Sequence, residues 1–449
     1  MKDKAQNVAC VILAAGKGTR MRSKLPKVMH KVAGKPMLFN VIDTVLSCHA
    51  GKVIVVTSPD MEATRKAVVT HYGDRVHNAV QQKQLGTGDA VKAAESELKG
   101  YKGNVIVLYG DTPLITRETV CTMAALLNDA PKVAVAVLGM QQPVPNAYGR
   151  LVMDRKGNIE RIVEVKDATA KEKAITTCNS GVMAIRGSLL FGLLERLDNK
   201  NANAEFYLTD LVKHARKDKH ICTMVPADPQ EVMGVNSRVE LAVAEEIAQD
   251  KLRRRALESG VTMIDPKTVY LSQDTILGSD VIIHPHVVFG PGVEVDHDVE
   301  IRSFSHIEGT RIRARAIIGP FARLRPGSDV GEEAHVGNFV ELKKATLDKG
   351  AKVNHLSYVG DAHVGEKSNI GAGTITCNYD GFSKYKTEIG AGSFIGSNTA
   401  LVAPVKIGSG AIIAAGSVIT KDVPDDALAI ARGRQEEKPE WAKSFRDKK

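Results

Sequence analysis

The sequence predicts two folds in one chain, an α/β doubly wound sheet over residues 1–237 and a parallel β-helix over residues 260–449. Short β-branched apolar runs alternate with helical patterns in the first part, as in parallel sheets covered by helices. In the last part, apolar residues recur every six positions, which fits neither the period of an α-helix nor that of a single strand. The segment 238–259 is predicted to be a helical linker. A chain of 449 residues is also too long for one core, which favours separate domains.

The first domain is predicted from apolar runs that have the length of buried strands. Helical patterns lie between them, for instance Pro36–Leu46 and Asp89–Leu98. In a doubly wound sheet, ligands bind at the carboxyl ends of the strands. The segment from Arg238 to Glu258 is polar and alanine-rich and contains neither glycine nor proline, so it is predicted to form one long helix. The predicted strands are Val8–Leu13, Val53–Val56, Val105–Leu108 and Val133–Leu138.

The six-residue repeat is expected to run from about Val269 to Val423. A parallel β-helix repeats short strands in every coil, and the aliphatic residue of each repeat points into a stacked core. Such a column needs only aliphatic residues to fold, so polar residues that interrupt the repeat are candidates for chemistry. The predicted inward rows are Ile312, Ile318, Leu324, Val330, Val336 and Leu342; Ile389, Ile395, Leu401, Ile407, Ile413 and Ile419; and the shorter runs Ile276, Ile282 and Val288, Val353 and Val359, and Val364 and Ile370.

Composition limits the possible classes of function. The chain is 43% hydrophobic and 25% charged and has no apolar run of about 18 residues, so no membrane span is expected. The start of the chain has no signal-peptide pattern. The net charge of +9 is spread along the chain and partly gathered in the tail Gln435–Lys449, without a recognition helix or aromatic platform. We therefore expect anionic small substrates and no nucleic acid. Six scattered cysteines are expected to be reduced thiols of a cytoplasmic protein.

The strand Val8–Leu13 leads directly into a glycine-rich turn, Ala14-Ala15-Gly16-Lys17-Gly18-Thr19-Arg20-Met21. Small residues let backbone N–H groups approach a phosphate closely, and Lys17 and Arg20 add positive charge. The dinucleotide-binding fingerprint would need a third glycine where Met21 stands, and the Gly-Lys-Ser/Thr of a Walker loop is missing. Considered alone, the turn could be purely structural.

The turn belongs to a wider set of motifs. They are Leu13-Ala14-Ala15-Gly16-x-Gly18-Thr19-Arg20-Met21, Leu25-Pro26-Lys27, Gln84-Leu85-Gly86-Thr87-Gly88-Asp89-Ala90, Tyr109-Gly110-Asp111, Tyr148-Gly149-Arg150, Glu164, Asn179-Ser180-Gly181 and Gly234-Val235-Asn236. This set resembles that of the sugar-1-phosphate nucleotidyltransferases. Together with the six-residue repeat, residues 8 to about 433 resemble the bacterial bifunctional N-acetylglucosamine-1-phosphate uridyltransferases and glucosamine-1-phosphate acetyltransferases. This resemblance implies a Rossmann-like nucleotidyltransferase domain, a left-handed parallel β-helix of hexapeptide repeats, and synthesis of UDP-N-acetylglucosamine for cell-wall and lipopolysaccharide precursors.

The resemblance implies a first site for UTP, N-acetylglucosamine 1-phosphate and Mg²⁺. Asp111 follows a strand, where a hard oxygen ligand can meet Mg²⁺, and the resemblance supplies Asn236 as the second ligand. Taken singly, Asp111 could instead cap a helix. Arg20 and Lys27 are the expected phosphate clamps. The remaining expected contacts are Gln81, Gly86 and Thr87 with uracil, Gly149, Glu164 and Asn179 with the sugar, and Leu13, Ala14, Ala15, Gly16, Tyr109 and Gly110 with other parts of UTP or the UDP-sugar.

A second site is predicted within the repeat. Arg325 and Lys343 are 18 residues apart, so in a coil of three six-residue sides they stack, and a sugar phosphate is the natural anion between them. His355 is the candidate base, because the amine of glucosamine must lose a proton to attack a thioester and histidine titrates near neutrality. Without these neighbours, a surface or packing role would be the simpler interpretation of this histidine.

The resemblance assigns roles around His355, which matches the catalytic histidine of the acetyltransferases. Glu341 is expected to orient it, and direct attack without an acyl-enzyme is implied, since Cys377 has no basic neighbour. The segment Asn378–Lys386 breaks the count of six and is expected to protrude as a loop that completes a site between the subunits of a homotrimer. Arg325, Lys343, Tyr358 and Asn369 match contacts of glucosamine 1-phosphate; Ala372, Asn378, Tyr379, Ser397, Ala415 and Arg432 match contacts of acetyl-CoA, with Asn378 and Tyr379 also matching amino-sugar contacts.

Two alternatives remain at this point. One is a nucleotidyltransferase with a single activity whose β-helix only oligomerises or regulates, which the polar cluster around His355 opposes. The other is a non-catalytic scaffold with a β-helical shaft, which the phosphate-binding turn and the cysteine pattern oppose.

Overall fold

The computed structural model describes residues 7–448. Residues 1–6, at the start of the predicted first domain, and Lys449, at the end of the predicted tail, lie outside the described residues. The chain divides into two compact units, Met1–Ala248 and Gln249–Lys449. This division falls inside helix α9 (Arg238–Glu258), whose bounds are those predicted from the sequence. Among the described residues, no helix is long and apolar enough to cross a membrane.

The N-terminal unit is built on a nine-stranded sheet with the order β11-β7-β10-β6-β1-β4-β5, beside which β8 pairs with β10 and β9 pairs with β8. The predicted strands are confirmed, and most neighbours along the main path are parallel. The sheet differs from an all-parallel one at β10, which is antiparallel to both β6 and β7 because the chain returns to it through the β8–β9 hairpin. The strands are β1 (Val8–Leu13), β4 (Lys52–Thr57), β5 (His77–Val80), β6 (Asn104–Tyr109), β7 (Val133–Gln141), β8 (Arg150–Met153), β9 (Ile159–Val163), β10 (Thr177–Ile185) and β11 (Ile221–Pro226); β2 (Lys31–Val32) and β3 (Lys35–Pro36) form a separate ribbon.

Both faces of this sheet are buried. Alternate residues of β1 belong to two different apolar clusters, Val8, Cys10 and Ile12 to one and Ala9, Val11 and Leu13 to the other. This alternation explains why the strands appear in the sequence as continuous apolar runs. The helices are α1 (Met37–Ser47), α2 (Glu62–Tyr72), α3 (Thr87–Lys92), α4 (Glu95–Leu98), α5 (Arg117–Asp129), α6 (Ala170–Lys173), α7 (Gly187–Leu194) and α8 (Asp210–Lys217).

The predicted helix Asp89–Leu98 is wrong in one respect, because it is divided into α3 and α4. Between them the backbone tightens, and the Ala94 N–H donates to the Val91 carbonyl at 3.0 Å. Ala94 is fully buried at this point. The helical spacing therefore continues in the sequence across a point where the helix itself is interrupted.

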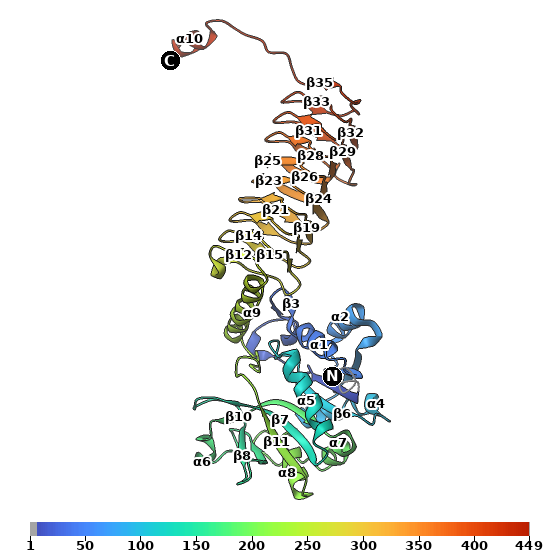
Figure 1. The fold of residues 1–449 in the computed structure, drawn as a ribbon, viewed down its shortest axis with the longest axis vertical. Helices are drawn as coiled ribbons and strands as arrows, with labels where there is room; N and C mark the ends of the chain where they lie inside the picture. Colours follow the sequence, from blue (N-terminus) through green and yellow to red (C-terminus); the bar gives the residue numbers. More distant parts are fainter. Residues whose placement is uncertain (1–6, 449) are drawn as a thin grey trace. The chain divides into compact units, whose positions relative to one another are not determined.

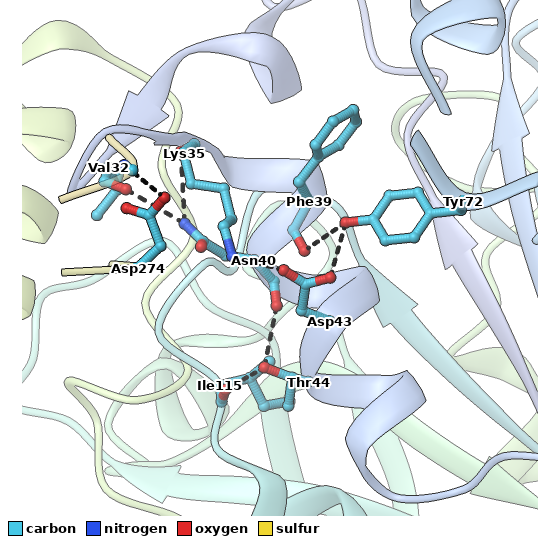
Figure 2. A network of polar contacts seen from close by, with 10 residues as sticks. Val32, Lys35, Phe39, Asn40, Asp43, Thr44, Tyr72, Ile115 and Asp274 are labelled. Carbon is cyan, nitrogen blue, oxygen red and sulfur yellow. Dashed lines mark hydrogen bonds and ion pairs between the residues drawn. The ribbon is translucent and has the colours of Figure 1, made fainter. Parts of the chain in front are cut away.

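Polar contacts fix helix α1 against its neighbours (Figure 2). The Tyr72 hydroxyl donates to Asp43 Oδ1 at 2.9 Å, and Asp43 Oδ2 pairs with the Lys35 ammonium at 2.6 Å. The Thr44 hydroxyl donates to the Ile115 carbonyl at 3.3 Å, just before α5 begins. These contacts favour one placement of α1 against α2, β3 and the residues just before α5, and the buried Tyr72 hydroxyl would be costly to leave without a partner.

The C-terminal unit is a parallel β-helix (Figure 1). Its short strands pair in parallel with those of the next coil, in one sheet of ten strands and one of fourteen. The strands are β12 (Thr262–Met263), β13 (Ile276–Leu277), β14 (Ile282–Ile283), β15 (Val288–Phe289), β16 (Glu294–Val295), β17 (Glu300–Ile301), β18 (His306–Ile307), β19 (Thr310–Ile312), β20 (Ile317–Ile318), β21 (Arg323–Arg325), β22 (Ser328–Val330), β23 (His335–Asn338), β24 (Glu341–Leu347), β25 (Lys352–His355), β26 (Tyr358–Val364), β27 (Asn369–Ile370), β28 (Ile375–Cys377), β29 (Thr387–Ile389), β30 (Phe394–Ile395), β31 (Ala400–Val402), β32 (Val405–Ile407), β33 (Ile412–Ile413), β34 (Val418–Ile419) and β35 (Leu428–Ala429), and the tail carries the exposed short helix α10 (Trp441–Arg446).

The two long predicted rows are confirmed, since every member from Ile312 to Leu342 and from Ile389 to Ile419 is buried. The early run Ile276, Ile282 and Val288 is wrong. Ile276 and Ile282 are 59% and 42% exposed, and the inward residues are the next ones along the chain, such as Ile283. The cause is one shorter step in the inward row. Its residues are six positions apart up to Ile307, but only five positions separate Ile307 from Ile312. The row up to that point is Ile283, Phe289, Val295, Ile301 and Ile307. Counting back from Ile312 in sixes therefore selects the outward neighbour of every pair.

Candidate functional sites

A cavity of about 550 Å³ opens at the carboxyl ends of β1 and β6, where a doubly wound sheet binds ligands. Most of the predicted nucleotide contacts line it. Arg20, an exposed residue of the short helix Thr19–Met21, lies outside this lining, and Lys17 of the same turn takes part in it. The lining residues are Leu13, Ala14, Ala15, Gly16, Lys17, Lys27, Val28, Gln81, Gln84, Gly86, Thr87, Ala90, Tyr109, Asp111, Glu205 and Asn236.

Two glycines shape the loops around the cavity. Gly18 has φ +60°, and a Cβ there would lie 2.6 Å from the Cβ of Lys27. Gly86 has φ +121°, and a Cβ there would lie 2.6 Å from the Phe206 carbonyl oxygen. Only glycine combines this backbone conformation with so close an approach. The first motif therefore brings its turn against Lys27, and the second brings the Gly86-Thr87 backbone to the cavity.

Two glutamines hold the second motif in place. The Gln81 amide donates to the Gly86 carbonyl at 3.1 Å and to Asp89 Oδ2 at 2.8 Å. The Gln84 amide donates to the Ala15 carbonyl at 2.5 Å, which ties the second motif to the turn after β1. Gln81 is buried, and its amide N–H groups already donate to these two partners. Its predicted contact with uracil would therefore use the amide oxygen as a hydrogen-bond acceptor.

Lys27, Asp111 and Asn236 meet at one point of the cavity. The Lys27 ammonium contacts the Asp111 carboxylate and donates to Asn236 Oδ1 at 3.0 Å. The Val235 N–H donates to the Asp111 carbonyl at 2.8 Å, so the segments that carry the two oxygen ligands lie side by side. A carboxylate and an amide oxygen directed at one cation are the donor types that Mg²⁺ prefers.

These residues fit Mg²⁺ only as a partial ligand set. Within residues 7–448, no group of three or more histidine, cysteine, aspartate or glutamate side chains could hold a metal ion. The ligands beyond Asp111 and Asn236 would therefore be water or phosphate oxygens, which is the usual arrangement for Mg²⁺ at nucleotide sites.

The three predicted sugar contacts lie together. The Asn179 N–H donates to the Gly149 carbonyl at 2.8 Å, and both carboxylate oxygens of Glu164 lie 3.4 Å from where a Gly149 Cβ would stand. Burial raises the pKa of Glu164, an effect that the Thr209 hydroxyl, 3.3 Å away, opposes. Burial, and then the charges of Glu164 and Asp111, raise the pKa of Tyr109, which lines the cavity. Tyr109 of the cavity lining is therefore within reach of the charge of Glu164.

In the β-helix, Arg325 and Lys343 are direct partners in the β21–β24 register, which confirms the predicted stack. Each cation also contacts a carboxylate, which the spacing did not predict. Arg325 Nη1 lies 2.8 Å from Glu341 Oε1, and Lys343 Nζ lies 3.2 Å from Asp361 Oδ2. Lys384, in the loop after β28, approaches the same place, and its contact with Lys343 lowers the pKa of Lys384. Arg325, Lys343 and Lys384 therefore lie close to the carboxylates of Glu341 and Asp361.

His355 ends strand β25, and its imidazole is exposed. Its Nδ1 lies 2.7 Å from Oδ1 of Asn338, its partner in the β23–β25 register. The expectation that Glu341 orients His355 is wrong, because Glu341 begins β24 in the other sheet and pairs with Arg325. Asn338 makes the contact with His355 instead. With an amide oxygen as acceptor, Nδ1 carries the hydrogen and Nε2 keeps a lone pair.

Four of the six predicted acetyl-CoA contacts form a column along one corner of successive coils. The Asn398 N–H donates to the Ala372 carbonyl at 2.7 Å, and the Gly416 N–H donates to the Ser397 carbonyl at 2.8 Å. Arg432 Nη1 then donates to the Ala415 carbonyl at 2.8 Å. In chain order, the residues of the column are Ala372, Ser397, Ala415 and Arg432. These residues therefore lie on one edge, as a long thin ligand would require.

The segment Asn378–Lys386 interrupts the repeat, as predicted, between β28 and β29. Tyr379 and Lys384 form an antiparallel bridge, and the Asn378 amide contacts Asp361. Phe382 at the tip is 95% exposed. The loop is thus anchored beside Lys343 and projects an aromatic ring away from its own coil. Tyr358 begins β26 directly after the His355 corner, and Asn369 begins β27 in the next coil.

Comparisons with known proteins agree with both folds. Residues 10–176 match the family model for the MobA-like NTP transferase domain, and residues 386–421 match that for the bacterial transferase hexapeptide (six repeats). The chain is 54% identical over 442 residues to the bifunctional protein GlmU of Paramagnetospirillum magneticum, which covers 98% of this chain and 97% of that protein. It is 51% identical to the bifunctional protein GlmU of Zymomonas mobilis and 53% identical to that of Xanthobacter autotrophicus, in each case over 98% of both chains.

The chain belongs to the bifunctional protein GlmU family. It is therefore an enzyme with two activities, uridyl transfer and acetyl transfer in the synthesis of UDP-N-acetylglucosamine. This result confirms the resemblance found in the sequence and excludes both alternatives, the passive β-helix and the non-catalytic scaffold.

Several residues of this GlmU family member reach the two sites without having been predicted as contacts. Glu205 lines the nucleotide cavity, and Asn338, Asp361 and Lys384 surround the β-helix cluster. A signal existed for Asp361, which stands 18 residues after Lys343 as Lys343 stands after Arg325. Glu205 had no such signal, because it comes from a segment far from the glycine motifs along the chain.

Proposed function

We propose that the cavity at the end of β1 and β6 transfers uridyl groups and that the corner at His355 transfers acetyl groups. Acetyl transfer from acetyl-CoA to glucosamine 1-phosphate comes first, and the product, N-acetylglucosamine 1-phosphate, then reacts with UTP and releases pyrophosphate. The observations that support the second assignment are the stack of Arg325 on Lys343 and a histidine whose Nδ1 is held by an amide. A β-helix needs none of these residues to fold.

In the uridyl-transfer site, a phosphate oxygen of the sugar phosphate attacks the α-phosphorus of UTP, and pyrophosphate leaves. Negative charge then gathers on phosphate oxygens, which positioned cations stabilise. Lys27 is the central cation of this chain, and its contact with Asp111 and Asn236 fixes its ammonium in the cavity. Asp111 and Asn236 would hold Mg²⁺, which supplies further charge neutralisation when bound.

The assigned domains are 1–237 for uridyl transfer, 238–259 as linker and 260–449 for acetyl transfer.

In the acetyl-transfer site, His355 Nε2 accepts a proton from the amine of glucosamine 1-phosphate. The amine nitrogen attacks the thioester carbon of acetyl-CoA, an amide bond forms, and the CoA thiolate leaves and takes up a proton. Asn338 keeps the hydrogen on Nδ1, so Nε2 is available as the base. Arg325 and Lys343 bind the sugar phosphate, and the column from Ala372 to Arg432 binds CoA.

We propose a homotrimer in the cytoplasm, where UTP and acetyl-CoA are available. The support is the loop around Tyr379, 58% exposed, and Phe382, 95% exposed. Aromatic side chains that project so far from their own coil favour contact with a second copy. Sedimentation velocity tests the assembly, and a monomer that retains full acetyl transfer would contradict a site shared between subunits.

The assignment is tested by incubating the protein with glucosamine 1-phosphate, acetyl-CoA, UTP and Mg²⁺ while CoA and pyrophosphate are followed together. Asp111→Ala is expected to abolish pyrophosphate release and to leave CoA release intact. His355→Ala is expected to reduce CoA release by about 10²-fold or more, the scale for a positioned general base, and to leave uridyl transfer from supplied N-acetylglucosamine 1-phosphate unchanged.

Each variant is the control for the other. Near-normal uridyl transfer by Asp111→Ala would remove this residue from the metal site. CoA release within a few-fold of wild type in His355→Ala would indicate another base. Cys377→Ala is expected to retain turnover, and its inactivity would revive a covalent mechanism.

A further inference from the structure

Three thiols of the N-terminal unit lie apart from the nucleotide cavity, on Cys10 of β1, Cys48 at the end of α1 and Cys121 of α5. The Sγ atoms of Cys121 and Cys48 are 2.6 Å apart. This separation is shorter than the normal approach of two non-bonded sulfur atoms. Cys10 belongs to the same buried cluster as Cys48, and burial, followed by the proximity of Cys48 and Cys121, raises the pKa of its thiol.

The pair sits at a fixed interface between two helices. Cys48 Sγ lies 3.2 Å from the Arg117 carbonyl, and Arg117 Nε donates to the Ser47 carbonyl at 3.0 Å. One turn earlier in α1, Thr44 donates to the Ile115 carbonyl (Figure 2). The end of α1 and the start of α5 are therefore held together by several contacts besides the thiols. A disulfide requires such fixed, closely placed backbones, because its geometry is narrow.

The two thiols differ in access to solvent. Cys48 is 3% exposed, whereas Cys121 is partly exposed on the surface of α5. Burial, together with the neighbouring Cys121 thiol, raises the pKa of Cys48 to about 12. A dissolved oxidant therefore meets Cys121 first, and Cys48 is placed to react with the Cys121 sulfur once that sulfur is part of a mixed disulfide with the reagent.

We propose that Cys48 and Cys121 form a reversible disulfide site that low-molecular-weight disulfides such as oxidised glutathione oxidise. The Cys121 thiolate attacks one sulfur of the reagent, the reagent's S–S bond breaks, and one thiol leaves. The Cys48 sulfur then loses its proton and attacks the Cys121 sulfur of the mixed disulfide, and the second thiol leaves. Two protein thiols are oxidised, and one reagent disulfide is reduced to two thiols.

The cross-link would join α1 to α5 and enclose the chain between them, which includes the turn that carries Asp111. Closing a long loop restricts the unfolded state more than the folded state. The oxidised protein is therefore expected to unfold its N-terminal unit at a higher temperature than the reduced protein. This inference concerns a modification site outside both transfer sites and does not rest on the proposed function.

The test uses the full-length protein, incubated under native conditions with oxidised glutathione, blocked with an alkylating reagent and digested for mass spectrometry. We expect a peptide pair linked through Cys48 and Cys121, an intact mass lower by two hydrogen atoms before alkylation, and full reversal by dithiothreitol. The melting temperature should rise on oxidation and fall again on reduction. Cys222→Ser removes a buried thiol on strand β11, away from the pair. It is the matched control and should give the same linked pair.

Two variants separate the steps. In Cys48→Ser, glutathione should remain attached to Cys121, because the resolving thiol is gone. In Cys121→Ser, Cys48 should stay unmodified; the melting curve and uridyl-transfer rate of each reduced variant verify that it has folded. A lasting glutathione adduct on Cys121 in the wild type would overturn the proposal. So would the absence of the linked pair under conditions that oxidise the same two cysteines in urea-unfolded protein.

Discussion

Replacing Asn338 by alanine is the sharpest test of the acetyl-transfer geometry. The variant removes the acceptor 2.7 Å from His355 Nδ1. A single hydrogen bond contributes about 0.5–1.5 kcal/mol net, and about 1.4 kcal/mol corresponds to a tenfold change in rate. Without the acceptor, the imidazole is free to rotate and to place its hydrogen on either nitrogen. We therefore expect kcat for acetyl transfer to fall about 2- to 10-fold, much less than in His355→Ala.

The assay is CoA release at saturating glucosamine 1-phosphate and acetyl-CoA, with uridyl transfer by the same preparation as the internal reference. Asn338→Asp keeps an acceptor oxygen at the same position and should retain most of the activity. His335→Ala lies three residues earlier on β23 and controls for truncating a polar side chain of this strand. An unchanged kcat in Asn338→Ala, or a change confined to KM, would refute the proposed positioning of His355.

Three further predictions concern the N-terminal unit. Gly86→Ala should lower uridyl transfer more than tenfold and destabilise the unit by about 1–3 kcal/mol, because the new Cβ would meet the Phe206 carbonyl at a φ of +121°. Gly100→Ala is the control: Gly100 has φ +79° but open space around it among the described residues, so this variant shows the effect of backbone strain without a steric clash. Because burial raises the pKa of Glu164, its folded state holds a proton that the unfolded state releases, so stability falls as pH rises from the unfolded to the folded pKa. In thermal melts taken across this pH range, Glu164→Gln should show a smaller loss of stability with rising pH than the wild type. The same pH dependence in both proteins would contradict a raised pKa of Glu164. Chelation of Mg²⁺ should stop pyrophosphate release and spare CoA release, and an equal loss of both would contradict a metal role confined to the Asp111 cavity.

Much of the fold was predictable because burial on one or two faces leaves a direct pattern in the sequence. The bounds of β1 and α9 agree with those predicted, and the two long inward rows of the β-helix were identified residue by residue. The failure at Ile276 and Ile282 has a local cause, the five-residue step between Ile307 and Ile312. Two adjacent aliphatic residues hide such a step, since either of them fits the count.

The candidate sites were predictable only to the level of the motif. The stack of Arg325 on Lys343 follows from their spacing, and it is present. The partner of His355 does not follow from spacing, because Asn338 and Glu341 are close in the chain but begin or end strands of different sheets. Which side chain reaches the imidazole is decided by the corner between those sheets, and a linear pattern contains no information about it.

The corners of the β-helix also explain how its chemistry can change while its core does not. Ile370 pairs directly with Ile395 although the whole loop Asn378–Lys386 lies between them, and Ile301 pairs with Ile318 across the shortened step. Insertions and deletions are thus absorbed outside the stacked rows. Natural variants of this β-helix should differ in length mainly at such corners. The range of substrates can therefore change there while the buried rows, which fold the β-helix, stay the same.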